Sequence, residues 1–303
     1  MFRKKVASAK RAISNQGLGY QGRESMKTFL YSMVLIMALL VVNVDHALAG
    51  SQQHGKPSFS PEAIATFSKD VEKYAAGQGA RAFIIARRGR PVEDMPEGIR
   101  FTHTAIAIYS NIQLENGETA KGYAIHNLYQ DADKQDVSHL ITDYPVDFFW
   151  SAYALEAGII IPSVAVQQAL ISMYSEDKAK LLHNPRYSVV ANPFNSERQN
   201  CTEYTLDVLN AAVYSTTDIA QLKANAKAHF TPQKVNMSRA KLGLASMFSD
   251  GVTLSDHGRK VETTTFGRLA RYMQKYDLSE KTVIFTSNEQ ITNIEEFSNA
   301  DSE

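Results

Sequence analysis

The chain has 303 residues, with 32 Lys and Arg, 32 Asp and Glu, 44% hydrophobic residues and a single Cys. This globular composition excludes collagen-like, low-complexity and wholly disordered chains, and one cysteine excludes an intrachain disulfide or a zinc site built on cysteine pairs. Residues 1–49 hold 7 basic and 2 acidic residues, which leaves 32 − 7 = 25 basic and 32 − 2 = 30 acidic residues in 50–303. That acidic balance gives no electrostatic footprint for nucleic acid.

The first 49 residues are typical of a secretory signal. Phe29–Val42 is apolar except for Ser32, and Ala47-Leu48-Ala49 supplies the small residues that precede signal-peptidase cleavage. The apolar run is shorter than the roughly 20 residues of a membrane span. We therefore expect cleavage near Ala49, a periplasmic or secreted protein and no stable membrane span afterwards. Met26 begins a more usual signal and is the expected true start.

The rest of the chain predicts one domain. We expect residues 50–60 to be frayed, residues 61–286 to form a single domain and residues 287–303 to be a flexible tail, because both ends are polar and no Gly/Ser/Pro-rich linker interrupts the middle.

The first half of this domain predicts a helix followed by strands. Pro61–Ala76 has apolar residues at three- and four-residue spacing and a Pro at its start, which favours an amphipathic helix. Ala82–Ala86 is a short apolar run typical of a buried strand. Phe101–Ile112 and Lys121–Tyr129 are rich in β-formers and flank Asn116-Gly117, so they predict an antiparallel hairpin.

The second half predicts mainly helices. The apolar character of residues 147–174 indicates a helical insertion, and later segments alternate between helix and strand patterns. Separate helical and antiparallel blocks indicate the α+β class. The expected elements are helices at Asp147–Gly158, Pro162–Tyr174, Cys201–Tyr214 and Thr265–Tyr276, with strands at Ser188–Ala191 and Val283–Phe285.

The lone cysteine occupies a position that favours reactivity. Asn200 can cap the helix that follows, and Glu203 can reach back in a capping box, which puts Cys201 in the first helical turn. Such a position favours a thiolate and offers free amides to an oxyanion. The alternative is a buried cysteine that packs as a small hydrophobe.

Two histidines on the predicted hairpin could complete a site. Strand alternation puts His103 on the same face as Ala105 in the first strand, and His126 on the same face as Ala124 in the second. If the Cys201 helix packs on that face, His103 could be the base and His126 its orienter. The same three residues could instead hold zinc with an open fourth position. Asp256-His257 is interpreted as a solvated turn.

Three blocks resemble circularly permuted papain-like thiol enzymes, the group of NlpC-type peptidases and lecithin:retinol acyltransferase-like proteins. They are Phe101–Tyr109, Tyr123–Leu128 and Asn200–Tyr204, in the order His, polar residue, Cys. The chain also resembles a bacterial secreted family known only as domain of unknown function 2145, in part through its Arg88-Gly89-Arg90-Pro91 turn. The resemblance implies a permuted papain-like fold with Cys201 as nucleophile, His103 as base and His126 as third polar residue.

The expected function is therefore a secreted cysteine hydrolase or acyltransferase that acts on an amide or ester, such as a cell-wall peptide or a lipid, and requires no cofactor. The alternative is a non-catalytic binding or assembly module of the cell envelope that keeps the fold. The envelope substrate or partner stays unidentified.

Overall fold

The computed structural model describes residues 57–113, 116–235, 251–288 and 291–293. The chain divides into two compact units, Met1–Ala47 and Leu48–Glu303, and every described residue belongs to the second. The expected signal sequence, its cleavage near Ala49 and the start at Met26 lie outside the described residues. No helix within the described part is both long and apolar enough to span a membrane.

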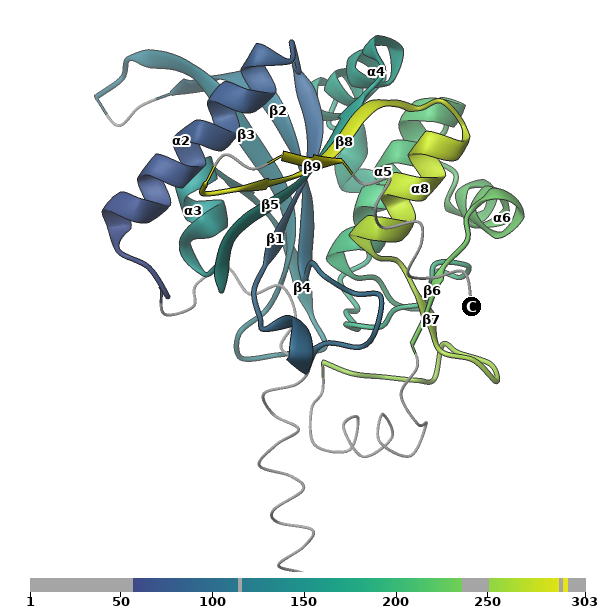
Figure 1. The fold of residues 1–303 in the computed structure, drawn as a ribbon. Helices are drawn as coiled ribbons and strands as arrows, with labels where there is room; N and C mark the ends of the chain where they lie inside the picture. Colours follow the sequence, from purple (N-terminus) through teal and green to yellow (C-terminus); the bar gives the residue numbers. More distant parts are fainter. Residues whose placement is uncertain (1–56, 114–115, 236–250, 289–290, 294–303) are drawn as a thin grey trace, which may run out of the picture. The chain divides into compact units, whose positions relative to one another are not determined.

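A seven-stranded sheet forms the centre of this unit (Figure 1), and each strand pairs antiparallel with its neighbours. The first strand of the sequence, β1, is central because it pairs with β2 on one side and β5 on the other. In spatial order the strands are β4 (Ser138–Asp143), β3 (Thr119–Gln130), β2 (His103–Gln113), β1 (Ala82–Arg88), β5 (Ala154–Pro162), β8 (Ser279–Thr286) and β9 (Ile291–Asn293).

Helices cover both faces of the sheet (Figure 1). On one face lie α2 and α3, and on the other lie α4, α5 and α8, with α6 packed against α5. We call these the α3 face and the α5 face. The helices are α2 (Pro61–Gly77), α3 (Pro145–Trp150), α4 (Val164–Ser175), α5 (Cys201–Tyr214), α6 (Ile219–His229) and α8 (Phe266–Lys275), and shorter elements are η1 (Val92–Asp94), η2 (Lys178–Leu182), β6 (Gln233–Lys234) and β7 (Glu262–Thr263).

Alternation along β1 shows why the sheet needs two helical layers. Ala82 and Ile84 belong to the core under α5, while Phe83 and Ile85 belong to the core under α2 and α3. Successive strand residues point to opposite faces, so a strand with apolar residues at every position must be covered on both sides. All four residues are at most 1% exposed.

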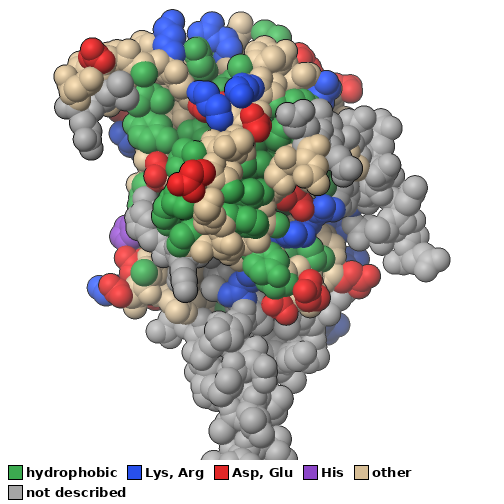
Figure 2. Space-filling view, turned by 60° about the vertical axis from the view of Figure 1, so that its left-hand side comes forward, with side chains coloured by type: hydrophobic (Ala, Val, Ile, Leu, Met, Phe, Trp, Pro, Cys, Tyr) green, Lys and Arg blue, Asp and Glu red, His purple; other side chains and the backbone are tan. Residues whose placement is uncertain are grey.

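The α3 face also carries exposed apolar surface. Figure 2 brings this side of the molecule forward, and hydrophobic side chains gather over its middle with charged side chains around them. On α3 itself Val146 is 38% exposed, and its N-cap residue Tyr144 is 41% exposed.

The α+β class and the antiparallel hairpin are confirmed. β2 and β3 pair in the register Ile106↔His126, and the turn between them contains Asn116 and Gly117. Gly117 has a φ of 83°, a conformation that glycine adopts without strain. Asn116 Oδ1 accepts a hydrogen bond of 3.0 Å from the backbone N–H of Glu118, which tightens the turn.

Two predicted elements are wrong, and two observed elements were not predicted. The expected helix Asp147–Gly158 is split into α3 and the first half of β5, so residues 147–174 are not a helical insertion: they include a strand near the centre of the sheet. An apolar run covered on both faces cannot be told from a core helix by periodicity. Ser188–Ala191 forms a turn, closed by Ala191 N–H donating to Ser188 O. Strand β4 and helix α6 were not expected.

Candidate functional site

Cys201 begins α5, as the sequence predicts. Asn200 is the N-cap, and its Oδ1 accepts a 2.9 Å hydrogen bond from the backbone N–H of Glu203. The return half of the capping box does not form, because the Glu203 carboxylate binds Lys223 instead. The sequence pattern therefore locates the helix start correctly and misassigns the glutamate.

The sulfur of Cys201 lies against the backbone just before β2. The residue is 4% exposed, and its Sγ is 4.0 Å from Thr102 O and 3.8 Å from Thr202 Oγ1. The Thr202 hydroxyl also bonds Thr104 Oγ1 at 3.1 Å. The start of α5 is thus fastened to the side of β2 on which Thr104 projects.

His103 projects from the other side of β2. Its Nε2 is 2.9 Å from Asn127 Oδ1, and its ring stacks on Tyr129 at 4.7 Å and tilts against Phe148 of α3 at 5.5 Å. The neighbour Thr104 faces α5, so alternation requires His103 to face α3.

His103 is a neutral base in this environment. Burial and the nearby Arg87 guanidinium hold the pKa of His103 well below its ordinary value. Its Nδ1 has no hydrogen-bond partner among the described residues. The ring is therefore enclosed by aromatic groups and oriented by one amide.

His126 lies on the α5 face. It pairs directly with Ile106 across the hairpin, stacks on Tyr174 of α4 at 4.1 Å and has its Nδ1 3.3 Å from Thr142 Oγ1. Burial, followed by the positive charge of Lys180, lowers the pKa of His126 to about 4. The ring lines a hollow of about 230 Å³ between β3, β4 and α4, which Tyr204 also lines.

The prediction that both imidazoles share a face with the cysteine helix is wrong. The register pairs Ile106 with His126, and His103 lies three positions before Ile106, so the two rings point to opposite faces. Neither ring forms a hydrogen bond with the sulfur in the described structure. The zinc alternative needs the same three groups together, and the sheet separates them.

Asn127 is the site residue that the sequence argument missed. Asn127 follows His126 on β3, so its side chain points to the opposite face of the sheet, where His103 lies. The sequence does not tell which of His126 and Asn127 faces His103, because both belong to one predicted strand and the strand register decides it.

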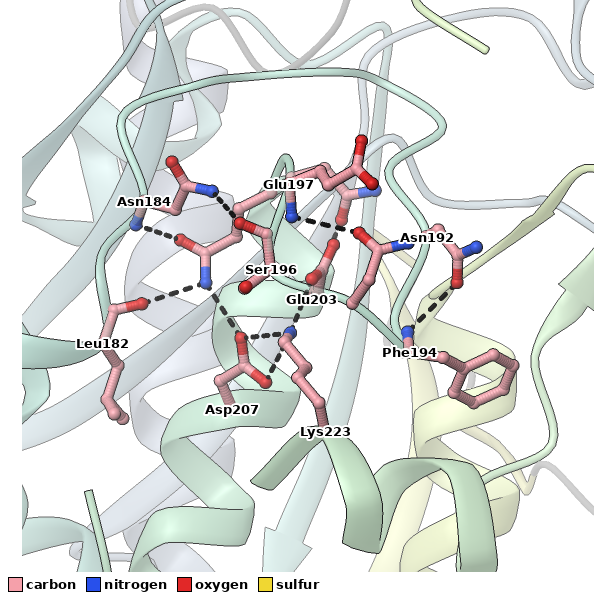
Figure 3. A network of polar contacts seen from close by, with 12 residues as sticks. Leu182, Asn184, Asn192, Phe194, Ser196, Glu197, Glu203, Asp207 and Lys223 are labelled. Atoms are coloured by element: carbon pink, nitrogen blue, oxygen red, sulfur yellow. Dashed lines mark hydrogen bonds and ion pairs between the residues drawn. The ribbon is translucent and has the colours of Figure 1, made fainter. Parts of the chain in front are cut away.

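A second polar cluster connects α5 and α6 (Figure 3). Lys223 Nζ lies 2.6 Å from Glu203 Oε1 and 2.8 Å from Asp207 Oδ2, and all three side chains are at most 9% exposed. Gln199 donates to Asp207 Oδ2 at 2.9 Å and to Leu182 O at 3.0 Å. The cluster therefore joins two helices to the loop that precedes α5.

This cluster holds two carboxylates and one ammonium, so it favours uptake of a proton. Burial and the neighbouring Asp207 raise the pKa of Glu203 to about 8, against the opposing effect of Lys223. The pKa of Lys223 is itself raised by the two carboxylates, so the ammonium stays charged.

Asp256-His257 is not the solvated turn that was expected. Asp256 and His257 are 5% and 9% exposed. His257 Nε2 is 2.7 Å from Val190 O, and Asp256 Oδ2 accepts from Asn192 N–H at 2.9 Å. These two hydrogen bonds hold the loop before α5 in place. The surrounding sequence is polar, so it does not indicate that Asp256 and His257 are buried.

A model of one protein family matches this chain. The family model described as "Uncharacterized protein conserved in bacteria (DUF2145)" matches residues 74–273, well over half of the chain. No curated protein and no solved structure matches. The matched range runs from the end of α2 to the end of α8 and includes Cys201 and both histidines. The chain thus belongs to the bacterial family DUF2145.

Proposed function

We propose that this chain is a non-catalytic binding module of the bacterial cell envelope. The observation that carries the proposal is the separation of Cys201 from His103 by the sheet. A thiol enzyme needs a base within hydrogen-bond reach of its sulfur, and the groups found at that distance are a backbone carbonyl and a threonine hydroxyl.

Burial of the whole cysteine helix supports this proposal. Residues 201–212 of α5 are all buried, which is the pattern of a central core helix. Cys201 then packs as a small hydrophobe beneath β2 and fastens the helix start. The envelope location continues to rest on the signal-like sequence of residues 1–49.

A cysteine hydrolase with a permuted papain-like fold is the second candidate, and one observation favours it. His103 Nε2 is oriented by Asn127 while its Nδ1 has no partner, which leaves one nitrogen free to take a proton. For this function the start of α5 would have to move so that the sulfur reaches that nitrogen. The substrate would be an amide or ester of the envelope.

Alkylation of the single cysteine separates the two candidates. Iodoacetamide at pH 6.5 should label native Cys201 at least 100-fold more slowly than the urea-unfolded chain, because the native sulfur is covered. The His103→Gln variant should react at the same rate as the wild type. Native labelling faster than that of the unfolded chain, and slowed by His103→Gln, would overturn the binding module in favour of the hydrolase.

A further inference from the structure

A hollow of about 220 Å³ lies where η2, the loop before α5 and α6 meet. Its wall includes Glu203, Asp207 and Lys223 of the buried cluster, and its rim includes Arg186 and Arg198. Neither the hydrolase expectation nor the proposed function assigns a role to this place. Its volume lies below the range of drug-sized ligand pockets, so it suits a smaller group.

The two arginines are neighbours across a short parallel bridge. Tyr187 pairs with Gln199, so the preceding residues Arg186 and Arg198 lie close together, and both line the hollow. Arg198 Nη1 donates to Tyr187 O at 3.1 Å, which fixes one guanidinium and leaves its other N–H groups for a ligand. Among the described residues neither arginine has an acidic partner within ion-pair distance.

The floor of the hollow contains an unsatisfied polar atom. Glu203 is 0% exposed, and its Oε2 has no hydrogen-bond partner among the described residues. In Figure 3 one oxygen of the labelled Glu203 faces Lys223 and the other points away from it. Lys223 uses its three donors on Glu203 and Asp207, so it cannot serve this atom.

We propose that this hollow binds a small oxyanion, a carboxylate or a phosphate, between Arg186 and Arg198, with Glu203 as a hydrogen-bond donor beneath it. This inference rests on the proposed binding function, since it names the class of ligand. Planar guanidinium groups bind carboxylate and phosphate oxygens in pairs, and two of them without acidic partners leave the rim with two uncompensated positive charges.

The charge of the floor is compatible with an anion. With its extra proton the cluster of Glu203, Asp207 and Lys223 is neutral overall, so it does not repel an anion held at the rim. A protonated carboxyl group also supplies the O–H that an incoming oxygen can accept. Glu203→Gln keeps a neutral donor at this position and should therefore bind the same ligands.

Calorimetric titration of the protein tests the proposal with three probes. An N-acetylated dipeptide with a free carboxylate, the same dipeptide as its C-terminal amide, and inorganic phosphate are titrated in turn. We expect saturable binding of the free carboxylate, of phosphate or of both, with a Kd below about 10 mM, and none of the amide. Binding of the carboxylate alone or of phosphate alone identifies the source of the oxyanion.

Substitution of single arginines tests whether the oxyanion binds in this hollow. Arg186→Met and Arg198→Met should each weaken binding at least 10-fold, whereas Arg81→Met, an exposed arginine elsewhere, should leave it unchanged. Thermal unfolding of each variant shows whether it is folded. No binding of either oxyanion, equal binding of the amide, or unchanged affinity in folded arginine variants would overturn the proposal.

Failure of this inference is distinguishable from failure of the proposed function. Slow alkylation of Cys201 together with no oxyanion binding would remove the ligand class and keep the binding module. Fast, His103-dependent alkylation would remove the module whatever the titrations give.

Discussion

The protein contains two buried polar clusters on opposite faces of one sheet, and they differ in the kind of side chain that stays uncharged. The α3-face cluster consists of Arg87, His103, Asn127, Tyr129 and Asp143, and it encloses a histidine that stays neutral. The α5–α6 cluster consists of Gln199, Glu203, Asp207 and Lys223, and it encloses a carboxyl group that retains its proton. Burial opposes ionisation in both.

The difference lies in what each cluster adjoins. His103 is packed between Tyr129 and Phe148, and the Arg87 guanidinium donates to Phe148 O, so α3 closes over the first cluster. Glu203 and Lys223 line a hollow whose rim carries two arginines. The first cluster thus stabilises the fold, and the second can also contact a ligand. Four substitutions test these assignments.

The largest effect is expected from removing the ammonium of the α5–α6 cluster. Lys223→Met leaves Glu203 and Asp207 buried without their shared cation, and breaking a buried ion pair in this way costs about 3–5 kcal/mol of unfolding free energy. Urea denaturation measures the loss. Lys227→Met, an exposed position on the same helix, should cost under about 0.5 kcal/mol. A cost below about 1 kcal/mol for Lys223→Met would contradict the assigned role of the cluster.

Glu203 should make the protein less stable as pH rises from 6.5 to 8. Its folded pKa of about 8 exceeds the ordinary value of 4.5, so across this window the folded state binds a proton that the unfolded state has released. The free energy of unfolding should fall by up to about 1.4 kcal/mol per pH unit. Glu203→Gln should flatten that slope, and an unchanged slope would show that Glu203 ionises normally.

Removing the amide that orients His103 should also destabilise the fold, by less than the loss of Lys223. Asn127→Ala leaves His103 Nε2 buried without its partner, a loss of about 1–3 kcal/mol. Asn111→Ala, on an exposed position of the neighbouring strand, is the control and should be nearly neutral. Equal effects of the two variants in urea denaturation would show that the His103–Asn127 contact is not formed.

His126 should produce the smallest of the four effects and the opposite pH slope. Its folded pKa of about 4 lies below the ordinary 6.5, so the unfolded state takes up a proton first and stability is lost as pH falls from 6.5 toward 4. Partial exposure limits the loss to about 1–2 kcal/mol. His126→Asn should remove it, and the same acid dependence in that variant would assign it to another group.

The sequence predicts the local elements well and the site poorly, for a physical reason. The helix start at Asn200-Cys201 and the turn at Asn116-Gly117 follow from short-range hydrogen bonding, which a few adjacent residues determine. Whether His103 and His126 share a face depends on hairpin register, and a shift of one residue moves a side chain across the sheet.

Contacts between residues that are far apart in the sequence could not be predicted either. Glu203 fits a capping box by spacing, yet Lys223 lies on α6, a helix whose own pattern is weak. Asp147–Gly158 could be a helix or a buried strand on composition alone, and the neighbours β1 and β8 decide it. These outcomes depend on tertiary packing, which no local pattern contains.

The central claim is that the sheet keeps Cys201 apart from a neutral His103, and NMR titration of the imidazole Cε1–H signals tests it most directly. The chain has 8 histidines, so His103→Gln assigns the signal. We expect His103 to become protonated only at a pH below that of an ordinary histidine, because burial and Arg87 lower its pKa, and we expect Cys201→Ala to leave its signal unchanged. A His103 that is protonated at pH 7 and loses that charge in Cys201→Ala would demonstrate a thiolate–imidazolium pair and contradict the account.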